Sequence, residues 1–156
     1  MLRIKIIVVD RTRSPFLSEG ESFYLKRLRR YANAEWLEVK AVPIKKGKAD
    51  EEIRAAEGRS ILKKLGPQDY LLSLDRTGKP YDSEGLAAHI EKLAGAHASL
   101  TFLIGGPLGL SEQILKSSHE ILSLSRMTLT HEMSRLILLE QLYRVFTILH
   151  GEKYHK

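Results

Sequence analysis

The sequence predicts an α/β fold with a mostly parallel sheet flanked by helices. About five apolar, β-branched segments alternate with about five helical ones, which is the pattern of a parallel sheet covered on both faces. In Leu100–Leu110 an apolar run ends in Gly105-Gly106-Pro107, and a helix-start signal follows at Ser111. The 156 residues, 43% of them hydrophobic, contain no linker, so we expect a single domain over residues 1–156.

The first half of the chain is predicted to supply three strands and two helices. Arg3–Val9 is rich in β-branched residues and stops at a polar loop, which predicts a strand. Ser18–Tyr31 has apolar residues at helical spacing, whereas Trp36–Ala41 alternates apolar and polar side chains as a strand does. We further expect a loop at Pro43–Lys48, a helix at Asp50–Leu65, a short buried strand at Tyr70–Leu74 and a loop at Thr77–Pro80.

The second half begins with a helix that Ser83 caps and that runs to about Ala94, where Gly95 stops it. Leu100–Ile104 is the buried strand that precedes the glycine loop. The remaining elements are a helix from Ser111 to about Ser118, a short strand at Ile121–Leu124, a long helix at Thr130–Leu149 and a tail at Gly151–Lys156.

The long C-terminal helix is apolar on more than one face. Residues 133–149 read MSRLILLEQLYRVFTIL, and a helix that is apolar nearly all round is buried nearly all round. Its own sheet covers only one side, so we expect a second subunit to cover the other in a two-fold homodimer. The alternative is packing against a neighbouring helix of the same chain. The polar interruptions Glu140, Tyr143 and Arg144 need partners or a function.

Composition and charge narrow the class of protein. The chain has no cysteine, which excludes disulfides, thiolate metal ligands and a cysteine nucleophile. No apolar run approaches the roughly 18 residues that span a bilayer, and no signal peptide is indicated, so we expect a cytoplasmic protein. The net charge of +6 favours a polyanionic partner, with a merely solvated basic surface as the alternative. The cations gather at Arg11 and Arg13, at Lys26 to Arg30, and at Lys45 to Lys48.

Local motifs indicate a ligand site without defining its chemistry. The glycine loop matches neither the dinucleotide fingerprint nor the P-loop, and a plain tight turn is the alternative to a ligand site. Asp75 ends a strand, where it either faces a ligand or caps the Thr77-Gly78 turn. No metal site is expected, because no histidine pair has metalloprotease spacing. There is also no nucleophile-elbow signature.

The histidines differ in context. Three of them, in ordinary helix or loop segments, are expected on the surface: His89, His97 and His119. His131 starts the long helix, where the positive end of the helix dipole disfavours an imidazolium ion. His155 lies in the tail beside Tyr154, where the pair either serves acid–base chemistry or is a frayed end.

Five motifs, taken in order along the chain, resemble one family. They are Leu72-Ser73-Leu74-Asp75 with Gly78-Lys79, Leu103-Ile104-Gly105-Gly106-Pro107 with Gly109-Leu110, Leu124-Ser125 with Thr128-Leu129 and His131, then Glu140-Gln141-Leu142-Tyr143-Arg144, and the terminal Tyr154-His155-Lys156. No single motif is specific. Together they are similar to the ribosomal RNA large-subunit methyltransferase H family, which are minimal SPOUT, or α/β-knot, enzymes.

The resemblance implies a fold, a cofactor and a substrate. It implies a C-terminal deep trefoil knot, which ordinary chain-connection rules do not predict. It also implies a homodimer that uses S-adenosylmethionine, without a metal, to methylate N3 of a pseudouridine in 23S rRNA of the assembled ribosome. S-adenosylmethionine has no phosphate, in agreement with the missing P-loop. The cofactor-binding residues implied by position are Leu74, Gly105, Leu124, Ser125, Arg126, Met127, Thr128 and Leu129.

Four further residues are candidates for the chemistry. We expect His155 with Tyr154 to contact the target base, and Arg144 to stabilise developing negative charge or bind phosphate. Glu140 would orient Arg144, and the tail would reach the partner's cofactor pocket.

Two positions depart from the family pattern, and two other functions stay open. Asp10-Arg11 stands where members often carry Gly-Lys, and Thr130 stands where Pro commonly precedes the motif histidine. The alternative functions are a non-catalytic basic RNA- or ribosome-binding dimer and a SPOUT methyltransferase acting on tRNA.

Overall fold

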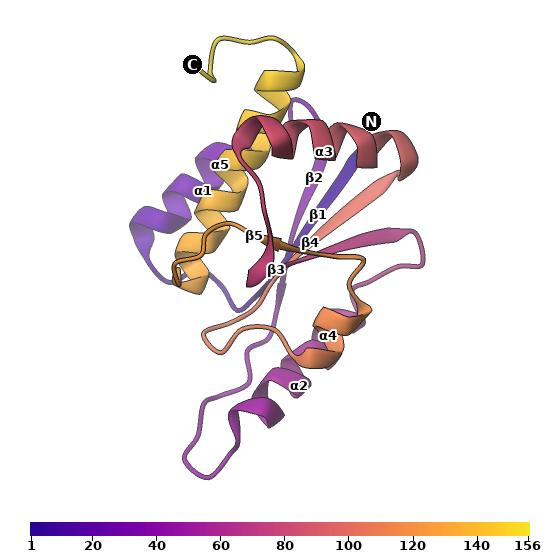
Figure 1. Cartoon of the computed structure of the whole chain (residues 1–156). Coiled ribbons are helices and arrows are strands. Elements are labelled where there is room, and N and C mark those ends of the chain that lie inside the picture. Colours follow the sequence, from indigo (N-terminus) through magenta and orange to yellow (C-terminus); the bar gives the residue numbers. More distant parts are fainter.

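A five-stranded parallel sheet forms the centre of the protein, for which a computed structural model describes all 156 residues (Figure 1). Every neighbouring pair of strands is parallel, so the carboxyl ends of the strands meet at one edge. This confirms the predicted parallel sheet. In spatial order the strands are β2 (Asn33–Val39), β1 (Arg3–Val9), β4 (Ser99–Ile104), β3 (Asp69–Pro80) and β5 (Glu120–Ser123).

Five helices cover the two faces of the sheet. Side chains alternate along β1, so that Ile4, Ile6 and Val8 pack into one hydrophobic cluster, whereas Ile7 and Val9 pack into another. The larger cluster lies under α1 (Pro15–Leu28), α3 (Ser83–Ala96) and α5 (His131–Leu149), and the smaller one under α2 (Asp50–Leu62) and α4 (Glu112–Ser117). No helix combines the length and apolarity that crossing a membrane requires.

The long helix α5 packs against α1 and α3 as well as against the sheet. Leu138, Leu139 and Leu142 are fully buried, and no residue of α5 is fully exposed. Neighbouring helices of the same chain therefore cover much of the apolar surface that the sequence attributed to a second subunit. Ile137 and Ile148 stay partly exposed.

Several element boundaries differ from the prediction. α1 begins at Pro15 rather than Ser18, because proline suits the first helical turn, and it ends at Leu28, after which hydrogen-bonded turns reach Tyr31. β2 starts at Asn33 and stops at Val39, in register with the whole length of β1. α2 ends at Leu62, three residues before the predicted end.

The predicted loop at Thr77–Pro80 belongs to a strand instead. Leu74 and Lys79 of β3 both lie opposite Leu122 of β5, so the residues between them bulge out of the ladder. A Cβ atom on Gly78 would lie 2.6 Å from the backbone carbonyl carbon of Ile121, so only glycine allows this approach. The pairing with β5, which is distant in sequence, keeps this turn-like sequence inside the sheet.

Candidate active site

A pocket of about 280 Å³ lies at the carboxyl ends of β3, β4 and β5. Three segments form its wall: Leu74–Arg76 in the β3 bulge, Ile104–Gly109 after β4, and residues between Leu124 and Leu129 after β5. His131 and Ser134 of α5 complete it. Its volume is near the lower end of the roughly 300–1,000 Å³ that small-molecule sites occupy, and this edge is where open α/β sheets bind ligands.

The glycine loop after β4 is folded tightly upon itself. Gly106 and Gly109 form an isolated antiparallel bridge, and the Gly109 N–H donates to the Gly106 carbonyl at 2.9 Å. Gly109 has φ +82°, in the left-handed region, and a Cβ atom on Gly105 would lie 2.4 Å from the Gly109 carbonyl carbon. The loop therefore presents bare backbone to the pocket.

The segment after β5 is shaped by short-range hydrogen bonds. The Ser123 hydroxyl donates to the Ser125 carbonyl at 3.0 Å, and the Ser125 hydroxyl accepts from the Met127 N–H at 3.0 Å. Thr130, the second departure from the family pattern, caps α5, because its hydroxyl accepts from the Met133 N–H at 3.2 Å. The cap keeps the helix start in place without a proline.

The pocket brings together nearly all of the residues expected to bind a cofactor. The expected residues that line it are Leu74, Gly105, Leu124, Ser125, Met127, Thr128 and Leu129. Arg126 is exposed and is not among the lining residues. Pro107 and Leu108 also line the pocket, although sequence reasoning did not single them out as site residues.

Asp75 serves the turn and also reaches the pocket. Its carboxylate accepts hydrogen bonds from the backbone N–H of Thr77, at 3.0 Å, and from the Thr77 hydroxyl. This is the capping arrangement that the sequence allowed. Because Asp75 also lines the pocket, the turn that it caps forms part of the wall.

The four residues expected to carry the chemistry form one cluster at the other end of α5. Glu140 accepts from Arg144 Nη2 at 2.6 Å and from the Tyr154 hydroxyl at 2.9 Å. Arg144 Nη1 lies 3.2 Å from His155 Nδ1, and the Arg144 guanidinium lies 4.7 Å from the centre of the Tyr154 ring. These contacts hold the end of the tail in place, so it is not a frayed terminus.

Protonation differs among the members of this cluster. Burial and hydrogen bonds to Tyr24 and Glu140 raise the pKa of Tyr154, so its hydroxyl stays a donor at neutral pH. The hydrogen bond to Glu140 raises the pKa of Arg144, which remains a cation. Since Arg144 donates, His155 Nδ1 accepts, and a neutral His155 ring carries its proton on Nε2.

The tail cluster does not line the pocket of its own chain. Arg144 lies thirteen positions after His131 in the helix, which corresponds to roughly 20 Å along the axis. One chain thus holds the two halves of the expected site at opposite ends of α5.

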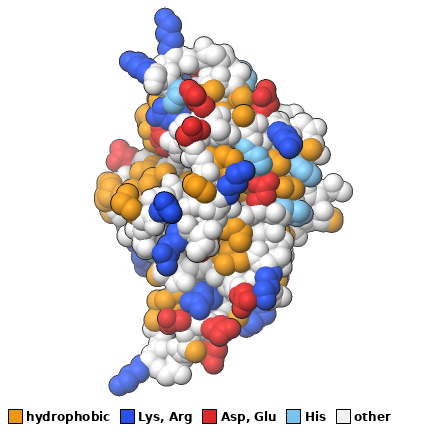
Figure 2. All heavy atoms as spheres, viewed as in Figure 1, with side chains coloured by type: hydrophobic (Ala, Val, Ile, Leu, Met, Phe, Trp, Pro, Cys, Tyr) orange, Lys and Arg blue, Asp and Glu red, His pale blue; other side chains and the backbone are white.

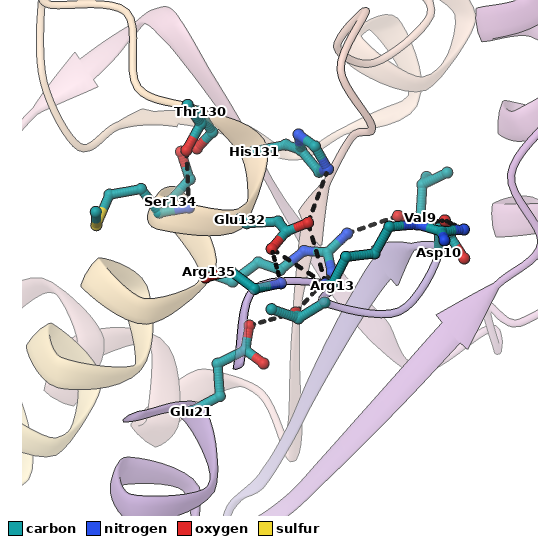
Figure 3. A network of polar contacts seen from close by, with 12 residues as sticks. Val9, Asp10, Arg13, Glu21, Thr130, His131, Glu132, Ser134 and Arg135 are labelled. Carbon is teal, nitrogen blue, oxygen red and sulfur yellow. Dashed lines mark hydrogen bonds and ion pairs between the residues drawn. The ribbon is translucent and has the colours of Figure 1, made fainter. Parts of the chain in front are cut away.

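His131 stands at the start of α5, beside Glu132 (Figure 3). Burial and the positive charge of Arg135 lower the pKa of His131, so its imidazole is mostly neutral at pH 7. Its Nε2 lies 3.9 Å from a Glu132 carboxylate oxygen. The sequence predicted a disfavoured imidazolium from the helix dipole, and the structure adds burial as a cause.

Arg135 is a fully buried residue that sequence reasoning missed (Figure 3). Its Nη2 donates to the Val9 carbonyl at 2.6 Å, and its Nη1 donates to the Thr12 hydroxyl at 2.9 Å. That hydroxyl in turn donates to Glu21 at 2.5 Å. Arg135 thereby ties the end of β1 to α5. The available signal was a cation beside the apolar run Leu136–Leu139 of the long helix, since a buried charge needs partners.

Two of the three histidines expected on the surface are partly buried instead. His89 Nε2 pairs with Glu120 at 2.6 Å, and the His97 ring stacks on Tyr70 with centroids 4.2 Å apart. His119 is exposed as expected, although its ring also stacks on Tyr70 and its Nδ1 accepts from the Leu71 N–H. Partners from distant strands and helices supply these contacts. The structure contains no group of three or more metal-ligating side chains.

The basic residues form separate groups rather than one patch. Arg11 and Arg13 follow the carboxyl end of β1, whereas Lys26 to Arg30 lie at the end of α1, roughly 20 Å of helix away. Arg27 stacks on the Phe23 ring and Arg29 donates to the Ala34 carbonyl, so part of this charge serves packing. Figure 2 shows Lys and Arg side chains interspersed with acidic and apolar ones on the face drawn.

The fold and the pocket together define the class of protein: an α/β protein with a small-molecule site at the carboxyl edge of a parallel sheet, walled by a glycine loop without phosphate-binding motifs. The chain belongs to the SPOUT methyltransferase family. A family model described as "Predicted SPOUT methyltransferase" matches residues 2–155.

Known proteins resemble the chain over its whole length. "Ribosomal RNA large subunit methyltransferase H" of Halothermothrix orenii is 42% identical over 159 residues, covering 99% of this chain and 100% of the relative. The protein of the same name from Listeria monocytogenes is 41% identical, with the same coverage. The solved structure of a probable methyltransferase from Bordetella pertussis has a TM-score of 0.57 at 13% identity, covering 92% of this chain and 96% of that one. A probable methylase family protein from Haemophilus influenzae has a TM-score of 0.53 at 14% identity, covering 98% and 70% respectively. These two likenesses bear on the fold alone.

Proposed function

We propose that this protein transfers a methyl group from S-adenosylmethionine to N3 of a pseudouridine in 23S rRNA of the assembled ribosome. The observation that carries the proposal is the pocket, because three motifs that are far apart in the chain and carry the family resemblance meet there. The identity of 41–42% to relatives named as large-subunit ribosomal RNA methyltransferases supports the substrate class. The assignment of pseudouridine as the target and of S-adenosylmethionine as the cofactor rests on the resemblance of the motifs to the family.

The pocket residues fit an adenosyl cofactor. Leu74, Leu124 and Leu129 are half-buried side chains on its wall and offer apolar surface to the faces of a purine. The glycine loop offers backbone N–H and C=O groups at close range. Arg76 is the only Lys or Arg on the wall, as suits a cofactor without a phosphate. We propose that these segments hold S-adenosylmethionine.

The tail cluster fits the other half of the reaction. The bound cofactor supplies a methyl group on a positively charged sulfur. N3 of pseudouridine must lose its proton before its electron pair bonds the methyl carbon, while the electrons of the carbon–sulfur bond pass to sulfur. A base that takes the proton, or a cation that stabilises the anion, lowers this barrier. We assign Arg144 as that cation, Glu140 as the group that orients it, and His155 with Tyr154 as the contact to the base.

We further propose that the active site is shared between two copies of the chain. The pocket and the tail cluster lie roughly 20 Å apart along α5 within one chain, so they do not act on one nucleotide there. A two-fold dimer that places the tail of one protomer at the pocket of its partner brings them together.

The size of the chain favours a preassembled substrate. A single domain of 156 residues offers little surface for free RNA, whereas a ribosome presents its target already folded. A ribosomal substrate places the activity in the cytoplasm. The deep C-terminal trefoil knot stays a prediction, because strand order and register describe neighbours in the sheet and not how the chain is threaded.

The proposal is tested by mass spectrometry of 23S rRNA from cells with and without this protein. We expect one methylated pseudouridine to be lost without it and restored when purified protein and S-adenosylmethionine are added to the isolated ribosomes. Unchanged rRNA together with a missing modification in tRNA would overturn the substrate. Intact folding without cofactor binding in calorimetry would favour a non-catalytic binding protein.

A further inference from the structure

A second cleft, of about 520 Å³, adjoins the pocket described above. It lies at the carboxyl ends of β1 and β2, between the loop Asp10–Arg13, the segment Lys40–Ile44 and the facing side of α2. Pro107, Leu108 and His131 line both cavities. A molecule in the second cleft therefore contacts the same wall as a cofactor in the first pocket.

The acidic side chains of this cleft are engaged within the protein. Asp10 pairs with Arg13 at 2.8 Å, and the buried Glu57 accepts from the Val42 N–H at 3.1 Å. Glu132 accepts from the backbone N–H of Arg13 at 3.2 Å, and its side chain is only 14% exposed. The negative charge of Asp10 is thus neutralised by Arg13, and the carboxylates of Glu57 and Glu132 are bound to backbone N–H groups of the protein.

Two cations at the cleft have no such partner. Arg11 and Lys40 are exposed, and their side chains form no ion pair and no hydrogen bond within the protein. The cleft is also lined by the apolar side chains of Ile44 and Leu108 and by the buried Ile53, which together make up its apolar floor. The combination of unpaired positive charge and an apolar floor suits a phosphate joined to a flat base.

The loop that carries Arg11 is held rigidly (Figure 3). Asp10 has φ +67°, an uncommon conformation for a residue other than glycine, which persists only where the surroundings impose it. Arg135 imposes it by holding the Val9 carbonyl and the Thr12 hydroxyl, on either side of Asp10 and Arg11. The buried network therefore fixes the cationic loop at the mouth of the cleft.

We infer that this cleft binds an RNA nucleotide that flanks the methylated base, with Arg11 and Lys40 contacting its phosphates and the apolar floor contacting its base. The inference rests on the proposed function, since the pocket next to the cleft would hold the methyl donor. Contacts to the flanking phosphates would set the register that brings the target base to the shared wall of Pro107 and His131.

The test compares charge-removing variants in binding to ribosomes from cells that lack this protein. The variants are Arg11→Gln, Lys40→Gln and the double variant. Lys92→Gln is the matched control, because Lys92 is exposed on α3, has no ion pair and lines neither cavity. Each single variant at the cleft is expected to bind about threefold to tenfold more weakly and to lower the slope of log affinity against log salt by about 0.7–0.9, and the double variant is expected to lower that slope by about twice as much. Calorimetry with S-adenosylmethionine should show unchanged cofactor binding.

Equal ribosome affinity and equal salt slope in the wild type, the double variant and Lys92→Gln would overturn the inference. So would a matching loss in Lys92→Gln, because the effect would then come from net charge. Methyl transfer by the wild type to the same ribosomes is measured separately. If the wild type transfers methyl groups and the double variant binds ribosomes as well as the wild type does, only the inference about the cleft is refuted. If the wild type binds ribosomes but transfers no methyl group, the proposed function is refuted, and the variants can still be compared for ribosome binding.

Discussion

At the scale of single residues, the groups proposed to hold the cofactor are separate from the groups proposed to act on the base. His155 belongs to the second kind, since it contacts Arg144 and is remote from the pocket of its own chain. Tyr154, with a raised pKa, is a donor that holds Glu140 in place. The same four-residue cluster thus contains the cation Arg144 and the His155 ring that accepts its hydrogen bond, with Glu140 and Tyr154 hydrogen-bonded to each other beside them.

His155→Ala is expected to lower the rate of methyl transfer about 100-fold or more, because it removes the proposed contact to the base. The measurement is the initial rate on ribosomes with labelled S-adenosylmethionine, and Lys156→Ala is the neighbouring control. An unchanged rate in His155→Ala would show that the assigned role is wrong.

Glu132 makes the stability of the protein depend on pH. Burial alone would raise the pKa of Glu132, but the hydrogen bonds from the N–H groups of Ser14 and Arg13 outweigh it and hold this pKa below its ordinary value of 4.5. A carboxylate whose pKa is lower in the folded state than in the unfolded state stabilises the fold at pH values above its unfolded-state pKa. This stabilisation is lost as the pH falls through the folded-state pKa. The β1–α1 loop is therefore bound to α5 most firmly at neutral pH.

Glu132→Gln should be less stable than the wild type at about pH 6.5, and this difference should shrink at about pH 3.5. Urea unfolding at the two pH values measures it, and Glu91→Gln on the exposed surface of α3 controls for the loss of one charge. A difference that stays constant with pH would contradict the assigned role of the carboxylate.

At the scale of elements, the loop between β4 and α4 depends on one glycine more than on the next. A Cβ atom on Gly105 would lie within 2.4 Å of backbone atoms, which do not move aside cheaply. On Gly106 the nearest atom would be a methyl group of Val9 at 3.4 Å, which is an ordinary contact. An alanine at Gly105 can therefore be compared with an alanine at the adjacent Gly106 as its control.

Gly105→Ala is expected to destabilise the protein by about 1–3 kcal/mol, because the loop must open to admit the new methyl group. The open loop should bind S-adenosylmethionine at least about tenfold more weakly, since the site loses its preorganisation. Gly106→Ala should change both properties little. Thermal unfolding and calorimetry measure them, and equal cofactor affinity in the two variants would show that the loop is not part of the cofactor site.

At the scale of the whole molecule, the two ends of α5 support the proposed dimer. The pocket lies at the start of this helix and the tail cluster at its end. Sequence reasoning argued for a dimer from the apolar character of α5, but α1 and α3 cover much of that surface. The stronger argument is the distance between the two halves of the site.

Co-expression of His155→Ala with Gly105→Ala is expected to restore about a quarter of the wild-type activity, because half of randomly paired dimers are mixed and each mixed dimer has one intact site. At a concentration of S-adenosylmethionine too low to saturate Gly105→Ala, each variant alone should be much less active than the mixture. Recovery is measured as methyl transfer by the purified mixture. An absence of recovery, with mixed dimers confirmed by mass spectrometry, would place both halves of the site in one chain.

Local patterns determined much of this protein. The β-branched run Arg3–Val9, the apolar run before Gly105 and the long periodic helix predicted the parallel α/β sheet, because these signals depend on residues close together in the chain. The same is true of the loop residues that line the pocket, since all of them follow predicted strands. Only the tertiary structure decided which distant residues meet. Four features arise from contacts between distant parts of the chain, where three-dimensional packing overrides local preference. They are the burial of Arg135, the stacking of His97 and His119 on Tyr70, the bulge that keeps β3 paired past Leu74, and the cleft beside the pocket.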